Sequence, residues 1–255
     1  MLNQSMMKDG TWKKILFYIM IIMIWELVYR FIGFPSPMEV FESISIMIKN
    51  GTLGVAILIS LRRLFTGYLI SLCIGLLVGI FILKLKSTRD SFVKLLGALQ
   101  TMPNVCWVPF AVLWFGVNEK AILFVVIIGS VFAVSMAIES GIKNINPTYI
   151  RVAEMTGARG YTLYKEVIFP AAIPVIISGV KQGWAFAWRG LIAGEMIASS
   201  MNGLGEILSN GKKYNDINEI VAIMVVIIVV GLVIDRVVFE NIESSVRRKF
   251  GLKNA

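Results

Sequence analysis

Long apolar runs separated by short polar segments are the dominant pattern of this chain. Six runs stand out, at about residues 14–33, 64–83, 92–115, 121–139, 167–198 and 219–239. A helix that rises 1.5 Å per residue needs roughly 20 residues to cross ~30 Å of hydrocarbon. We therefore predict an all-α membrane protein with six transmembrane helices, in one transmembrane domain that covers residues 1–255. The first run lacks a small-residue cleavage site, so we interpret it as a retained span and not as a secretion signal.

The polar segments carry an orientation signal. Segments that a cytoplasmic start would place inside hold fourteen lysines and arginines, whereas the outside segments hold four. Such an excess follows the positive-inside rule, so both termini are predicted to be cytoplasmic. The chain is 57% hydrophobic and 16% charged, whereas a soluble domain usually carries about 25% charged residues. Membrane orientation therefore explains the net charge of +9, and no nucleic-acid partner is indicated.

Several kinds of chemistry are excluded by residue type. The chain has no histidine, which removes histidine-based metal sites, nucleophile triads and proton relays. Its two cysteines, Cys73 and Cys106, lie in or beside apolar runs without metal-binding spacing. The stretch closest to a phosphate-binding loop, "GEILSNGKK" (205–213), has one residue too many between its glycines and no hydroxyl after the lysine. We therefore expect no ATP hydrolysis by this chain.

A polar segment at 142–166 lies on the predicted cytoplasmic side. Asn146 can cap a helix that has Pro147 at its first position and ends near Thr156, where Gly157 supplies a left-handed stop. A second helix would start near Tyr161, and Pro170 and Pro174 would kink the entry of the fifth span. Ile150, Ala153 and Thr156 share one face, which favours docking into a groove of a cytosolic partner. The alternative is an ordinary connecting loop.

This segment resembles the EAA loop of permease subunits from binding-protein-dependent ABC importers. Ala153 matches the second alanine of that pattern, Gly157 its central glycine, and "FPAAIP" (169–174) its proline end. Arg151 stands where the family usually has glutamate, and Val152 replaces the first alanine. Four further stretches resemble the nitrate, sulfonate and taurine branch of the family. They are "PSPMEV" (35–40), "SLRRLFTGYLISLCIGLLVGI" (60–80), "MPNVCWVPFAVLWFGVNEKA" (102–121) and "AWRGLIAGEMI" (187–197).

The resemblance implies a type I importer permease fold in a bacterial cell membrane. It implies three kinds of protein partner: a second permease subunit, expected to be another copy of this chain, two cytosolic ABC ATPases, and an extracytoplasmic binding protein. ATP and Mg would be bound by the ATPases, with no cofactor in this chain. The cargo would be a small polar or anionic solute. The residues expected to couple the chain to the ATPases, within the loop 147–169, are Ile150, Arg151, Ala153, Glu154, Gly157 and Ala158.

Ionisable groups within the spans are costly, so they mark candidate path residues. Arg189 could attract an anionic solute, with Trp184 and Trp188 as an aromatic wall, and Glu195 and Pro103 complete the predicted path set. The alternative is that Arg189 pairs with Glu195 or Asp235 and only fixes helix packing. Breaks of the third span at Pro103 and Pro109 could make it discontinuous, and the alternative is a simple kink. We interpret Lys181 as a snorkelling side chain, and Arg62 and Arg63 as membrane anchors or binding-protein contacts.

Two other functions compete with the importer permease. A self-sufficient secondary carrier would usually show a sequence repeat and several membrane-embedded acids for ion coupling. This chain shows no repeat and few such acids. A membrane-embedded enzyme would need a histidine, paired carboxylates or a metal cluster, and the spans show none of these.

Overall fold

The structure is a computed structural model that describes residues 12, 16–17, 19–27, 29, 31, 33–85, 87–198 and 202–249. Every secondary-structure element in these ranges is helical, which confirms the all-α prediction. The helices are α2 (Pro37–Lys49), α3 (Thr52–Lys84), α4 (Arg89–Thr101), α5 (Trp107–Phe115), α6 (Glu119–Lys143), α7 (Pro147–Met155), α8 (Gly160–Leu163), α9 (Phe169–Ile197), α10 (Leu204–Tyr214), α11 (Ile217–Ile234) and α12 (Asn241–Lys249). A short 3₁₀ helix, η1 (Asn104–Cys106), and two π-helical segments, η2 (Tyr164–Ile168) and η3 (Asp235–Glu240), join some of them.

Among the described residues, four continuous helical stretches are long and apolar enough to cross a membrane. They are Thr52–Lys84, Glu119–Lys143, Gly160–Ile197 and Ile217–Val246. A fifth candidate is the pair Arg89–Thr101 and Asn104–Phe115, which is bent by 90°. Six residues of the first predicted run, 14–33, lie outside the described residues, and most of those described within it are helical. The structure thus supports four or five spans, while six spans and cytoplasmic termini remain predictions.

Two predicted spans have different boundaries from those expected. The second begins at Thr52 and not at residue 64, so Arg62 and Arg63 lie inside the helix. The third is not one straight helix over 92–115, because it breaks between Thr101 and Asn104. Met102 is extended, as a residue before proline prefers, and Pro103 has no backbone N–H to continue the helix. The prediction of a break at Pro103 is therefore confirmed, as a right-angled turn rather than a kink.

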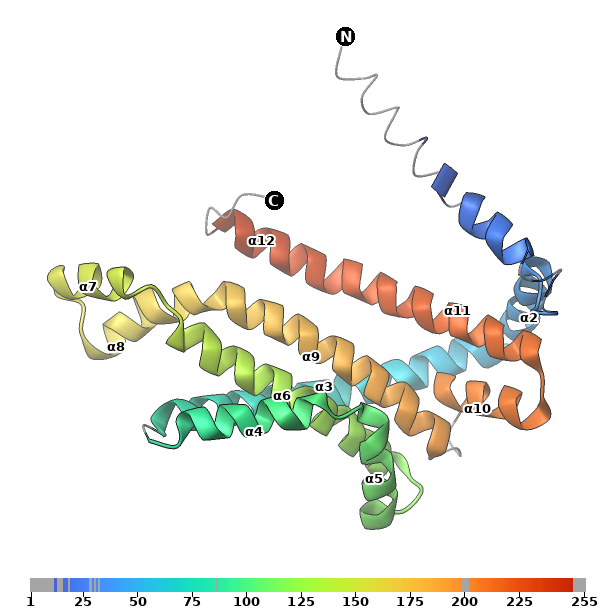
Figure 1. Cartoon of the computed structure of the whole chain (residues 1–255), viewed down its shortest axis with the longest axis horizontal. Coiled ribbons are helices and arrows are strands. Elements are labelled where there is room, and N and C mark those ends of the chain that lie inside the picture. The colour runs from blue at the N-terminus through green and yellow to red at the C-terminus, as the bar shows by residue number, and fades with distance from the viewer. Residues whose placement is uncertain are drawn as a thin grey trace, which may run out of the picture.

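Helix α6 is the centre of the bundle, packed between α3 and α9 (Figure 1). Small residues allow these helices to approach closely, as is common in membranes. A methyl group at Gly75 of α3 would come within 2.7 Å of Val134 on α6, and one at Gly179 of α9 would overlap Ala137. The buried hydroxyls of Ser71 and Ser130 also bridge α3 and α6 at 2.6 Å. The close-packed core of the described bundle is thus formed by α3, α6 and α9.

The two ends of the bundle carry different short helices (Figure 1). Helices α7 and α8 lie at one end, while α2 and α10 lie at the other, beside the start of α11. Helix α2 begins with a capping box between Ser36 and Glu39. Its Val40 is buried, whereas Phe41 is exposed, so Val40 lies on the face of the helix that packs against the protein.

Candidate functional site

Helix α7 has the caps that the sequence predicts. The Asn146 side chain accepts a hydrogen bond from the Thr148 N–H at 2.9 Å, and Pro147 opens the helix. At the other end Gly157 has φ +88°, and its N–H donates to the Glu154 carbonyl at 3.0 Å. The N–H of Ala158 donates to the Ala153 carbonyl at 2.9 Å. This pair of bonds is a Schellman motif, which ends the helix abruptly and sets its direction.

The exposed face of α7 differs from the predicted docking face. Ala153 is buried, and Ile150 is half-buried against a small core that includes Ile168 and Ala172. These residues therefore hold α7 on its own bundle, and their expected contact with a partner stays a prediction. The apolar side chains that remain exposed are those of Tyr149, Val152 and Met155, of which Met155 is 88% exposed. Among the other predicted coupling residues, Arg151, Glu154 and Gly157 are exposed and Ala158 is half-buried.

At the opposite end of the bundle a buried ion pair joins α3 to α9. Arg63 donates to Glu195 at 2.8 Å, and the two side chains are 2% and 1% exposed. The Ser60 hydroxyl donates to the same carboxylate at 2.8 Å. Arg62 reaches Glu119, at the start of α6, at 2.6 Å. We call Ser60, Arg63 and Glu195 the α10-end cluster, because helix α10 completes it.

The first turn of α10 sits on this cluster. The N–H of Gly205 donates to the Glu195 carboxylate at 3.0 Å, and the N–H of Leu204 donates to the Ser60 hydroxyl at 2.9 Å. Helix α10 has no side-chain cap of its own, so these groups satisfy donors that would otherwise lack partners. A carboxylate here also complements the positive end of the helix dipole. A methyl group at Gly205 would lie 2.6 Å from Glu195 Cβ, so glycine is required for this approach.

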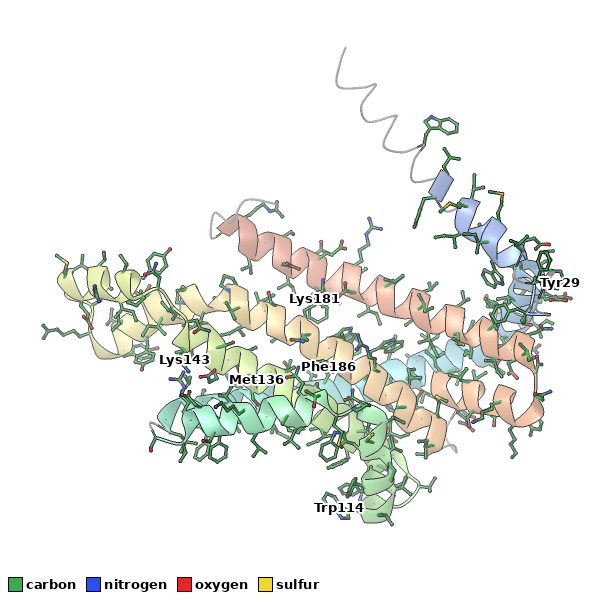
Figure 2. The ribbon with its side chains drawn as sticks, viewed as in Figure 1. Tyr29, Trp114, Met136, Lys143, Lys181 and Phe186 are labelled. Carbon is green, nitrogen blue, oxygen red and sulfur yellow. The ribbon has the colours of Figure 1, made fainter. Side chains whose placement is uncertain are left out.

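A second ionic cluster lies near α7, where α4 starts and α6 ends. Arg89 donates to Glu139 at 2.7 Å, and Lys143 contacts Asp90 at 3.0 Å. Lys143 is also 4.0 Å from Glu139, so the four side chains form one connected set. We call Arg89, Asp90, Glu139 and Lys143 the α7-end cluster. Figure 2 labels Lys143 beside the start of α4. Within the described residues, no group of three or more acids and cysteines could hold a metal ion.

Comparison with known proteins identifies the family. A model of the binding-protein-dependent transport system inner membrane component matches residues 71–248. The chain belongs to this family. A putative aliphatic sulfonates transport permease of Bacillus subtilis is 28% identical over 89% of this chain and 83% of its own length. The nitrate import permease of Synechocystis is 26% identical over 85% and 82%. A chain of the inward-facing MetNI methionine ABC transporter has the same fold, with a TM-score of 0.61 at 17% identity over 76% of this chain and 96% of that one.

The chain is thus an ABC importer permease subunit of the sulfonate and nitrate branch, which confirms the resemblance seen in its sequence. Relatives of this kind are subunits that do not catalyse a reaction themselves. The permease is a membrane protein with several spans. Its coupling residues and path residues are assigned by no comparison and remain predictions.

The structure separates the predicted path residues of the permease. Trp184 is buried among Tyr68 and Phe239, with ring centroids 5.2 and 5.7 Å away. Trp188 packs toward Gly231 of α11, and Glu195 belongs to the α10-end cluster. These three side chains face the interior of the subunit. Pro103 lies at the break between α4 and η1.

Arg189 lies on another face of α9. Its side chain is exposed, and Cζ stands 5.7 Å from the centroid of Phe186. The alternative that Arg189 pairs with Glu195 or Asp235 is wrong, because Glu195 pairs with Arg63 and Asp235 with Lys181 at 3.2 Å. Lys181 therefore joins α9 to η3 through an ion pair. Within the described residues Arg189 forms no ion pair.

Sequence reasoning misses most of the two ionic clusters. The predicted span starts one residue after Arg63, which makes this arginine look like an anchor, and Glu139 falls at a predicted span end. A signal is nevertheless present, since an acid inside an apolar helix demands a partner. Helix α10 is missed as well, because it follows Gly203 without a capping side chain.

Proposed function

We propose that this permease subunit carries a small oxyanion across a bacterial cell membrane and is driven by separate ATPases that dock on α7. Two copies of the chain would enclose the path, with both termini in the cytoplasm. ATP and Mg would be bound by the ATPases, and a binding protein would deliver cargo at the α10 end. Family membership supports the importer role, and the observation that carries the coupling proposal is the exposed apolar stripe of α7.

The stripe has the geometry of a docking helix. Tyr149, Val152 and Met155 follow one another at intervals of three residues, so they lie on one face. All three are exposed although each is apolar over much of its surface. The buried side of the helix is held by Ala153 and Ile150, so α7 is a fixed projection and not a mobile tail. When a groove in a partner accepts such a stripe, a movement of that partner would displace α7. Helix α7 would then transmit the displacement to α6 and α9.

The cargo proposal rests on charge and on relatives. The two relatives are named for aliphatic sulfonates and for nitrate, and both solutes are oxyanions. Arg189 offers an exposed guanidinium within a span, without an ion-pair partner in the described part of the chain. A guanidinium matches the geometry of an oxyanion because it can donate two parallel hydrogen bonds. We therefore assign Arg189 to the path as its anion-attracting residue.

Co-purification of the ATPase tests the coupling proposal. Met155→Glu places a charge at the exposed end of the docking stripe, and we expect ATPase recovery to fall about tenfold or more, as for a hot-spot contact. Met38→Glu is the matched control, since Met38 is 73% exposed on α2 at the other end. Unchanged recovery with Met155→Glu would show that α7 is a plain connector.

Gly157 offers a second test of the same helix. A side chain at position 157 would meet nothing within 4 Å, so only its φ of +88° resists substitution. A β-branched residue adopts that conformation at a cost of roughly 1 kcal/mol or more. Gly157→Val should redirect α7 and weaken both ATPase recovery and uptake, while Gly157→Ala should have a smaller effect. Equal behaviour of the two variants would argue against a directed coupling helix.

A further inference from the structure

A pocket lined by both apolar and polar residues lies between α4, α6 and α9, in the span region of the bundle. Its volume is about 420 Å³, and α4 and α9 each contribute a glutamine to its lining. The polar residues that line it are Gln100, Glu139, Ser140, Ser178 and Gln182. Figure 2 labels Met136, another lining residue, in the middle stretch of the bundle between the α7 end and the α10 end. Space of this size fits a small solute and not merely a water molecule.

Two glutamines give the cavity its chemistry. The chain contains three glutamines, and Gln100 and Gln182 are two of them. Neither side-chain amide has a hydrogen-bond partner among the described residues. Polar groups at membrane depth are costly unless they bind protein groups or face water. Two unpartnered amides that line one cavity therefore point to a hydrogen-bonding role toward a ligand.

The remaining polar groups leave the cavity close to neutral. Ser178 donates to the Pro174 carbonyl at 3.1 Å, so its oxygen stays available as an acceptor. Glu139 is 5% exposed and is paired with Arg89 at 2.7 Å, which offsets its charge. The groups that can reach out to a solute are thus the N–H donors of the amides.

The cavity continues the exposed face of α9 that carries Arg189. Ser178, Gln182 and Arg189 are all exposed, and they are separated by four and seven residues, which keeps them on one side of the helix. At 1.5 Å per residue, Gln182 lies about 10 Å along the axis from Arg189 and Ser178 about 16 Å. A solute attracted by Arg189 would meet the amides next as it moved toward the α7 end.

We propose that Gln100 and Gln182 form a transit station, which is a neutral binding site in the transport path. It holds a small oxyanion through amide N–H groups after the oxyanion has passed Arg189. This inference rests on the proposed function of the chain as an oxyanion permease. Neutral donors suit transit because a solute must bind well enough to enter and weakly enough to leave. A second fixed cation here would hold the anion too firmly.

Thiol modification in the assembled membrane complex tests the station without knowledge of the natural cargo. Single cysteines at positions 100 and 182 are introduced after Cys73→Ala and Cys106→Ala. The probes are the sulfonatoethyl methanethiosulfonate reagent, which is itself a small sulfonate, and its trimethylammonium counterpart of similar size. The control is the chain that keeps only native Cys73, an exposed residue of α3. We expect both introduced cysteines to react with the sulfonate reagent about tenfold faster than Cys73, as in a water-filled, field-focusing path.

Two second-site changes test the oxyanion preference. Arg189→Gln should slow the sulfonate reagent at both positions by about tenfold and leave the cationic reagent unaffected or faster. Gln182→Leu, combined with Gln100→Cys, should slow the sulfonate reagent at position 100 by about fivefold, the equivalent of one neutral hydrogen bond. Rates equal to that of Cys73, or equal slowing of both reagents, would overturn the station. ATPase co-purification with the same variants reports separately on the proposed function, so the two ideas can fail independently.

Discussion

The two ionic clusters of the permease occupy opposite ends of the bundle and differ in how far water reaches them. At the α10 end, Arg63 and Glu195 are 2% and 1% exposed, and backbone N–H groups of α10 complete the set. At the α7 end, Glu139 is buried but Lys143 and Asp90 are 45% and 77% exposed. Exchange of partners costs a large free energy for a charge pair that is shielded from water, and a small one for a hydrated pair.

This difference assigns different mechanical roles to the ends. The α10-end cluster joins α3, α9 and α10, so we expect that end to move as one unit. The α7-end cluster joins only α4 to α6, and Lys143 lies within contact of two acids, Asp90 and Glu139. Lys143 can therefore exchange between these two acids. If ATPases dock on α7 as proposed, we expect their motion to be taken up at the α7 end and transmitted by the close-packed core.

The largest expected effect is at Glu195. Glu195→Ala leaves Arg63 buried without this carboxylate and removes the acceptor of the Gly205 N–H, and breaking a buried pair costs about 3–5 kcal/mol. We expect strongly reduced yield of assembled complex and a large drop in its thermal inactivation temperature. The pair replacement Arg63→Met with Glu195→Leu should recover part of that loss, because no buried charge is left alone.

The control for this prediction is Glu119→Ala. Glu119 is 35% exposed, pairs with Arg62, which is 63% exposed, and lies 3.9 Å from Arg63 Nε, which keeps Glu195 as its closer partner, so its loss should be much smaller. A thermal inactivation temperature for Glu195→Ala equal to that of Glu119→Ala would contradict the idea of a rigid α10 end.

Sequence reasoning predicts the α7 region well and the clusters poorly, for a physical reason. The start and stop signals of α7, Asn146, Pro147 and Gly157, act within a dozen residues of one another. Arg63 and Glu195 are 132 residues apart. The sequence around either residue does not indicate that α3 and α9 contact each other at these two positions. The burial of Ala153 and Ile150 on α7 is likewise not visible in the local sequence, since it depends on Ile168 and Ala172 of the next segment.

An intermediate effect is expected at Arg89. Arg89→Met removes the 2.7 Å bond to Glu139 but leaves Lys143 only 4.0 Å from that carboxylate, so compensation is available. We expect a loss of about 1–3 kcal/mol, the range for an unsatisfied buried polar group. The thermal inactivation temperature should fall less than in Glu195→Ala. A fall as large as that of Glu195→Ala would show that the α7 end is as rigid as the other.

Arg89→Met also tests the link between this end and the ATPase. Loosening the start of α4 from α6 should leave ATPase binding intact, because the docking stripe of α7 is untouched. ATP hydrolysis per solute transported should rise, since less of the motion of α7 reaches the core. An unchanged ratio of hydrolysis to transport would separate the cluster from coupling.

The smallest expected effect is at Asp90, which is hydrated. Asp90→Asn removes one contact of Lys143, and the lysine keeps Glu139 as a neighbour at 4.0 Å. Exposed pairs contribute little to stability because solvent screens them and two long side chains must be ordered. In low salt, we expect the thermal inactivation temperature of the Asp90→Asn variant to differ slightly from that of the unsubstituted chain. In ~1 M salt, where the Debye length is about 3 Å, that difference should vanish. The Glu195→Ala difference should persist in the same salt, because its charges are buried. A salt-independent loss with Asp90→Asn would mean that the α7-end cluster is closed to water, and the contrast between the two ends would not hold.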